Sequence, residues 1–107
     1  MFSPGWYRWE WKDRGKLLVL EPWVPVTRMK DEDGSIRRIC VAPSPELAFL
    51  ALRDCAPDSM DELYLYKLIC GPPPVSVSRM MVPDVHKTGE QWLLQESLFE
   101  RVFLQER

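Results

Sequence analysis

The chain has 107 residues, a formal net charge of −2 and interspersed charges of both signs. This length predicts one domain, residues 1–107, and this balance does not predict a broad basic face for nucleic acid. No apolar run approaches the roughly 20 residues that a membrane span needs. The polar, aromatic N-terminus does not predict a secretory segment, and three cysteines without a C-x-x-C pair indicate free thiols in a reducing cytoplasm.

The first part of the chain predicts three strands and one extended segment. Residues 6–11 alternate aromatic and polar side chains, as a half-buried strand does, and residues 16–20 predict a second strand. Residues 22–27 contain two prolines, so we expect extended chain on the surface and no central strand. Residues 36–41 predict the next strand, and its apolar part, 39–41, predicts a central position in the sheet.

A helix is predicted by capping signals as well as by an apolar face. Ser44 can accept a hydrogen bond from an unpaired amide as the N-cap, and Pro45 is tolerated at the first helical position. Glu46 suits the positive end of the helix dipole, and Pro57 lies just beyond the expected end. We expect a helix at about residues 45–54.

The second part of the chain predicts further short strands. Residues 63–69 are strongly β-prone, residues 75–78 alternate, and residues 90–94 form an apolar run after a Thr-Gly turn. Residues 98–104 fit either a strand or a short helix. The fold class predicted is α+β, with one curved, mostly antiparallel sheet of about six to seven short strands and one main helix.

Metal and triad chemistry are not indicated. One histidine, scattered cysteines and unclustered carboxylates do not supply the usual ligand number, so we predict no metal site. His86 has Asp84 nearby, but alternation places both on one face of a short loop instead of a cleft. Arg37 and Arg38 are either solvated strand ends or the site of one anionic ligand.

Three polar residues on three different elements form the candidate site. Arg8, on the first strand beside Tyr7, can clamp a phosphate with two parallel hydrogen bonds. Ser44 lies where helix amides favour an anion, and Glu90 can stabilise positive charge on a sugar carbon or orient a hydroxyl nucleophile. Trp92 or another tryptophan can stack on a flat ring. If the outer two strands flank the middle one, the three residues converge.

Each of these residues also has a purely structural interpretation. Ser44 is then a helix cap, Arg8 a solvated strand residue, and Glu90 a surface group beside a turn. The five tryptophans are then core residues or part of an interaction face. Both interpretations stay open on the sequence alone.

Two resemblances extend this interpretation. The motif V-P-D-x(3)-T-G-E-x-W at 82–92, with the stretches 38–44 and 63–66, resembles a group of small uncharacterised proteins of bacteria and their phages. More loosely, the order of elements is similar to ADP-ribosyltransferase-like and RES-type NAD-consuming domains. That resemblance implies Arg8, Ser44 and Glu90 as catalytic residues lining an NAD cleft, with Arg8, Tyr7, Ser44 and Trp92 as cofactor-binding residues.

Two further kinds of protein fit the same sequence. The first is a non-enzymatic protein-binding module, such as a phage-encoded inhibitor of a host defence system, because small domains rich in tryptophan often present an aromatic patch to a partner. The second is a structural domain that associates with itself. The position of the tryptophans relative to Glu90 distinguishes the enzyme from the binding module.

Overall fold

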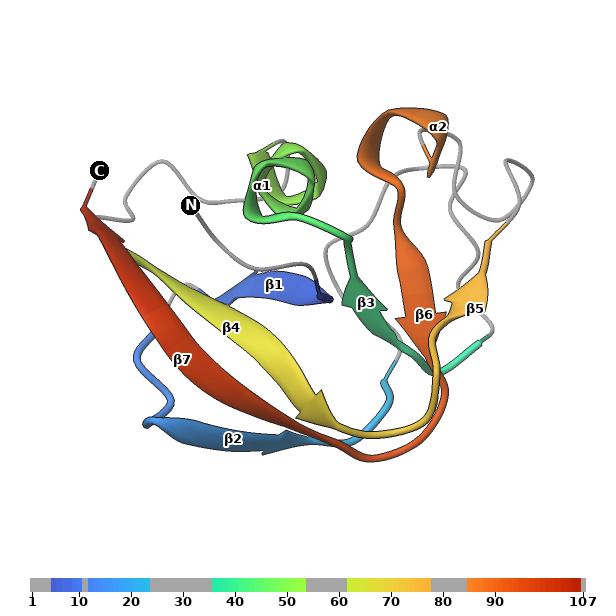
Figure 1. Cartoon of the computed structure of the whole chain (residues 1–107), viewed down its shortest axis with the longest axis horizontal. Coiled ribbons are helices and arrows are strands. Elements are labelled where there is room, and N and C mark those ends of the chain that lie inside the picture. Colours follow the sequence, from blue (N-terminus) through green and yellow to red (C-terminus); the bar gives the residue numbers. More distant parts are fainter. Residues whose placement is uncertain (1–4, 11, 24–35, 54–61, 78–84, 107) are drawn as a thin grey trace.

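The computed structural model describes residues 5–10, 12–23, 36–53, 62–77 and 85–106. Within these ranges, strands dominate and every ladder between strands is antiparallel (Figure 1). The elements are β1 (Tyr7–Glu10), β2 (Leu17–Leu20), β3 (Ile39–Val41), α1 (Pro45–Arg53), β4 (Glu62–Cys70), β5 (Val75–Ser76), α2 (Val85–Thr88), β6 (Gln91–Leu93) and β7 (Ser97–Glu106).

The presence of mostly antiparallel strands with helix α1 confirms the α+β class. The strands form two sheets, and the prediction of one curved sheet is therefore wrong. The four-stranded sheet has the order β1-β4-β7-β2, and the three-stranded sheet has the order β3-β6-β5. A single residue pair, Tyr7 with Ala42, joins β1 to β3. The two strands diverge after this pair, and one bridge does not make a continuous ladder.

Strand β3 closes the gap between the two edges of the four-stranded sheet. At one end Tyr7 and Ala42 exchange two backbone hydrogen bonds of 2.8 and 2.9 Å. At the other end Trp23, just beyond β2, exchanges bonds of 3.1 and 2.8 Å with Arg38. Because β1 and β2 are the outer strands of that sheet, the sheet curls so that β1 and the segment just beyond β2 approach the two ends of β3 (Figure 1).

The main core lies between the two sheets. Strand β2 alternates exposed and buried side chains, so that Leu18 and Leu20 face inward. They meet Ile39 and Val41 from β3. The buried members of this cluster are Leu18, Leu20, Ile39, Val41, Tyr66, Leu93 and Phe99.

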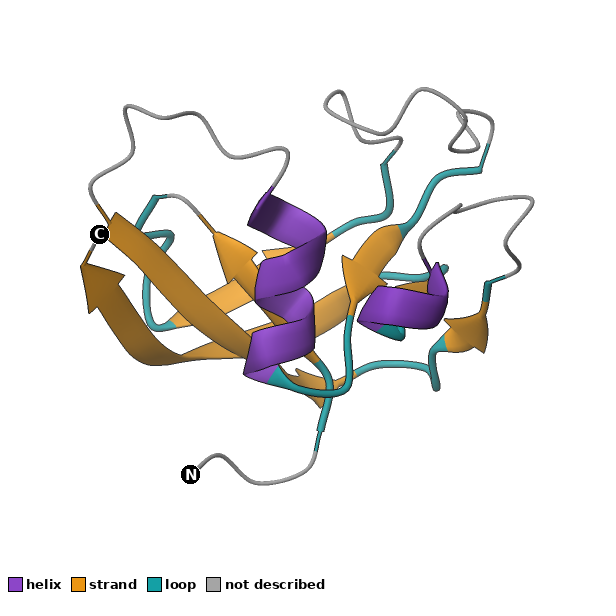
Figure 2. Ribbon diagram, turned by 90° about the horizontal axis from the view of Figure 1, so that it is seen from above, coloured by secondary structure: helices purple, strands orange, loops and turns teal. Residues whose placement is uncertain are grey.

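The helix prediction at 45–54 is confirmed by α1. The Leu47 amide donates to the Ser44 hydroxyl at 3.2 Å, which is the N-cap bond that the sequence predicts. The helix covers β1, where Ala48 packs in a second buried cluster with Tyr7 and Ala42. The one-turn helix α2 lies beside α1 on the same side of the sheets (Figure 2) and is too short to leave a periodic pattern in the sequence.

Strand positions and boundaries agree with the sequence in most places. Residues 98–104 belong to a strand, β7, because β4 and β2 both pair with it. The prediction of a central position for 39–41 is wrong, since β3 is the first strand in the order of its sheet. Ile39 and Val41 are apolar because they belong to the main core, whereas Cys40 between them is half-buried on the other face. Most of 22–27 and the charged tip at 30–35 lie outside the described residues.

Candidate functional site

The elements that carry the three predicted site residues are neighbours. Strand β3 pairs with β6 on one side, with Cys40 opposite Trp92, and meets β1 on the other side through Tyr7 and Ala42. Ser44 follows β3 directly, and Glu90 precedes β6 directly. The outer two strands therefore flank the middle one, which was the condition for convergence.

The Arg8 side chain hydrogen-bonds to the backbone of β3 where the backbone of β1 does not. The backbone groups of Arg38 and Ala42 bond along one edge of β3, so alternation turns those of Cys40 to the same edge. The Arg8 guanidinium donates through Nη1 to the Cys40 carbonyl at 3.1 Å and lies 5.0 Å from the Trp23 ring centroid. This side chain links β1, β3 and the segment after β2 with only 14% of its surface exposed.

A buried carboxylate holds Arg8 in that position. The Oε2 atom of Glu10 lies 2.9 Å from Nε and 2.8 Å from Nη2 of Arg8. Its other oxygen accepts a 2.9 Å bond from Nη1 of Arg14, which is 45% exposed. Glu10 was not among the site residues predicted from the sequence. Its position two residues after Arg8 on β1 places both side chains on one face, which could have indicated their pairing. Arg8 is therefore paired and half-buried, and its interpretation as a solvated strand residue is wrong.

Glu90 is buried, and so the interpretation as a surface group is wrong. Only 7% of the residue is exposed, and the Trp92 indole Nε1 donates to its Oε2 at 2.7 Å. The Glu90 amide donates to the Thr88 hydroxyl at 3.2 Å, and Gly89 has a φ of +66°, which glycine adopts without strain. The Thr-Gly turn thus delivers the carboxylate to the start of β6, beneath α2 and α1.

The Cys40 thiol lies within the electrostatic reach of both Arg8 and Glu90. Burial raises the pKa of this thiol to about 12, and the Glu90 carboxylate adds to the increase. The guanidinium groups of Arg8 and Arg38 oppose it. A thiol with this pKa stays neutral at physiological pH, which does not suit a nucleophile.

Arg38, which the sequence predicted to be either a solvated strand end or part of an anion site, is a buried member of this cluster. Its guanidinium lies 4.2 Å from the Trp92 ring centroid, and Nη1 donates to the Ile36 carbonyl at 3.0 Å. Arg37 is exposed whereas Arg38 is 0% exposed, so a shared solvated role for the pair is wrong. Alternation places Arg38 and Cys40 on the face of β3 opposite Ile39 and Val41, which belong to the main core.

The remaining predicted residues have structural partners. Ser44 caps α1 through its hydroxyl. Tyr7 and Trp92 are each 1% exposed; Tyr7 packs near Ala48 of α1, and the Trp92 ring packs against Arg38. Neither ring is accessible to a ligand in this arrangement.

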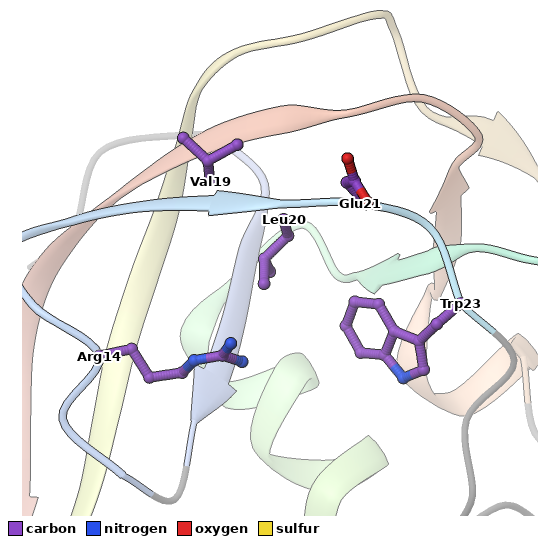
Figure 3. Close-up of a pocket in the computed structure, with 5 residues that line it drawn as sticks. All are labelled: Arg14, Val19, Leu20, Glu21 and Trp23. Atoms are coloured by element: carbon purple, nitrogen blue, oxygen red, sulfur yellow. The ribbon is translucent and has the colours of Figure 1, made fainter.

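A pocket of about 410 Å³ lies beside the Arg8 cluster, at the edge of β2. Figure 3 shows Arg14 and Trp23 reaching toward each other below the strand, with Leu20 between them. Val19 and Glu21 complete the lining, so none of Arg8, Ser44 and Glu90 lines it. The pocket adjoins the predicted site through the contact between Trp23 and Arg8 and through Arg14, which bonds to Glu10.

Within the described ranges, no three histidine, cysteine or acidic residues lie close enough together to hold a metal ion. Over the same residues, no helix has the length and apolar character that crossing a membrane requires. A comparison of the chain with protein-family models, curated proteins and solved structures finds no match.

Proposed function

We propose that the protein is an ADP-ribosyltransferase-like domain that binds NAD and transfers its ADP-ribose group to an acceptor. The observation that carries this proposal is the adjacency of β1, β3 and β6, which places Arg8 and Glu90 on either side of Cys40. The site residues come from elements far apart in sequence, as catalytic groups commonly do.

In this proposal NAD is a substrate, and two residues act on its charged parts. Arg8 holds the pyrophosphate, because a guanidinium presents parallel donors to phosphate oxygens. Glu90 stabilises the positive charge that builds on the ribose carbon as the bond to nicotinamide breaks. Ser44 braces this side of the site from the start of α1.

The residues around Arg8 fit such a ligand in two respects. Trp23 is half-buried with its ring on the pocket and beside the Arg8 guanidinium, so a flat ring and a phosphate can be bound next to each other. Glu10 holds that guanidinium in a fixed orientation, which lowers the entropic cost of binding. The Trp92 indole likewise fixes the Glu90 carboxylate.

The test is an NAD titration in which calorimetry measures binding, with the rate of nicotinamide release measured separately. Glu90→Gln keeps an oxygen that can accept the Trp92 bond but removes the charge. We expect the variant to bind NAD and to release nicotinamide at least ~100-fold more slowly. Glu96→Gln, at an exposed position that lines neither the site nor the pocket, is the matched control and keeps the rate. Absence of NAD binding by both wild type and Glu90→Gln would refute the proposal.

The alternative is a non-enzymatic protein-binding module, such as a phage-encoded inhibitor. Its original basis was a flat aromatic patch, but Trp6, Trp9 and Trp23 are half-buried and Trp92 is buried. The observation that favours it now is the exposure of two apolar side chains on β2, Leu17 at 58% and Val19 at 56%. If the protein does not bind NAD, and replacing Leu17 or Val19 abolishes its binding to a protein partner, this alternative is supported.

A further inference from the structure

Among the described residues, strand β2 is an open edge of the four-stranded sheet. It pairs with β7 on one side, in the register Leu18 with Phe99, and with no described strand on the other. The Lys16 carbonyl accepts from the Arg101 amide at 2.8 Å, so even-numbered backbone groups of this segment face β7. Those of Leu17, Val19 and Glu21 therefore face away from the sheet.

The hydrogen bonds of Trp23 confirm this alternation. Trp23 has the same parity as Val19, and its amide and carbonyl bond outward to Arg38. Within the described residues, no backbone bond of this kind reaches Leu17, Val19 or Glu21. Three consecutive outward positions thus offer donors and acceptors to an added strand.

The side chains of β2, Leu17–Leu20, are all apolar. Leu17 and Val19 are more than half exposed on the outer face of the sheet. Leu98 lies opposite Val19 on β7, and Ile69, in the β4 bulge beside Leu98, is 51% exposed. Between Lys16 and Glu21 the edge therefore continues into an apolar surface, and its exposed charges are confined to its two ends.

The other strand edges in the described part of the chain are protected. The edge of β1 is covered by the bridge from Tyr7 to β3 and by the Arg8 side chain. Strand β5, at the edge of the smaller sheet, has two residues and follows the proline run 72–74, which cannot donate to a ladder. The contrast singles out β2.

We propose that β2 pairs with β2 of a second copy of this chain, antiparallel and about a two-fold axis near Val19. In this register Leu17 of each copy lies opposite Glu21 of the other, and all three outward positions on each strand form backbone bonds. The four-stranded sheet becomes continuous through the dimer. This inference is independent of the proposed activity.

Charge complementarity selects a second copy as the occupant. The turn before β2 carries Lys12, Arg14 and Lys16 with one carboxylate, Asp13, and Glu21 directly follows the strand. Asp13 is paired with Arg101 and Arg14 with Glu10, so the exposed Lys12 and Lys16 keep this end basic. An antiparallel pair brings the basic end of each strand toward the acidic end of the other, so the edge is complementary to itself.

The experiment is sedimentation and light scattering of the full chain across a wide concentration range. We expect a reversible monomer–dimer equilibrium in wild type. Val19→Pro removes one outward donor and leaves the β7 ladder intact, because the Val19 amide is not part of it. We expect this variant to be folded by circular dichroism and to dimerise at least ~10-fold more weakly. Val75→Ser, at an exposed site on β5, is the control and dimerises as wild type does.

Two further measurements test the register and cover a folding failure of the proline variant. Val19→Lys places a charge at the two-fold axis and is also expected to give monomers. Hydrogen exchange on wild type should show the amides of Leu17, Val19 and Glu21 protected only at high concentration. A wild type that stays monomeric throughout, or a folded Val19→Pro or Val19→Lys that dimerises unchanged, overturns the proposal.

Discussion

Replacing Glu10 by alanine should be among the most damaging single changes in this domain. The carboxylate is 7% exposed and accepts bonds from Arg8 and from Arg14. Removing it leaves the mostly buried guanidinium of Arg8 in contact with the Cys40 carbonyl and the Trp23 ring but without its anionic partner. The Arg8 side chain also spans the gap between β1 and β3, so its displacement loosens the contact between the two sheets.

The size of the effect follows from how exposed each cation is. Breaking a buried ion pair by removing one partner costs about 3–5 kcal/mol of the free energy of unfolding. Arg8, with 14% of its side chain exposed, belongs near the lower end of that range. Arg14 is 45% exposed, and screening reduces its share to at most about 1 kcal/mol. We therefore expect about 3 kcal/mol for Glu10→Ala and under about 1 kcal/mol for Arg14→Ala.

Urea denaturation of the two variants measures this difference directly. A loss of 3 kcal/mol lowers the denaturation midpoint by about 2 M for a domain of this size, whereas Arg14→Ala should move it by well under about 1 M. The slope should not change, since both variants keep the same buried area. If Glu10→Ala costs no more than Arg14→Ala, the Arg8–Glu10 pair does not hold the sheets together, and the reasoning is refuted.

Two other predictions concern the thiol beside Glu90 and the glycines. In a variant that keeps Cys40 as its only cysteine, a pKa of about 12 leaves about one thiolate in 10,000 at pH 8. Alkylation by iodoacetamide should be about 1,000-fold slower than for an unfolded control, and comparable rates would contradict the burial of this group. Gly89→Ala should cost about 2–3 kcal/mol in thermal unfolding, because φ is +66° and an added Cβ would lie 3.2 Å from Pro43 Cδ. Gly15→Ala, whose added Cβ would lie 3.8 Å from the Leu17 carbonyl oxygen, should cost only about 1–2 kcal/mol for its φ of +92°. Equal costs would show that the contact with Pro43 is unimportant.

Local signals predicted the elements well because each is decided by a few neighbouring residues. Ser44 and Pro45 mark the start of α1, and alternation marks β1 and β2. Local signals could not predict the division into two sheets, because it depends on how few backbone bridges connect β1 with β3 and its flanking residues. Nothing near Tyr7 in the sequence indicates that its backbone bridges to Ala42, directly after β3.

The site shows the same limit. Alternation along β1 and β3 places Arg8, Glu10, Arg38 and Cys40, but the burial of each depends on what covers that face. Glu90 was predicted to open a strand, and its burial followed from Trp92 only two residues later, whose indole could have been recognised as a donor. The pairs of Glu10 with Arg8 and with Arg14 are local in sequence, whereas their burial depends on the curl of the larger sheet.

The pairing of β2 has a consequence for how the chain reaches this state. The ladder partner of Leu20 is Ser97, in the last strand that the structure describes. A nascent chain cannot complete the larger sheet until β7 has left the ribosome, and until then the apolar strand β2 has no ladder partner on either side. Contacts this distant in sequence place folding in the slow, millisecond-to-second range. During synthesis β2 is therefore the segment on which a chaperone is most expected to act.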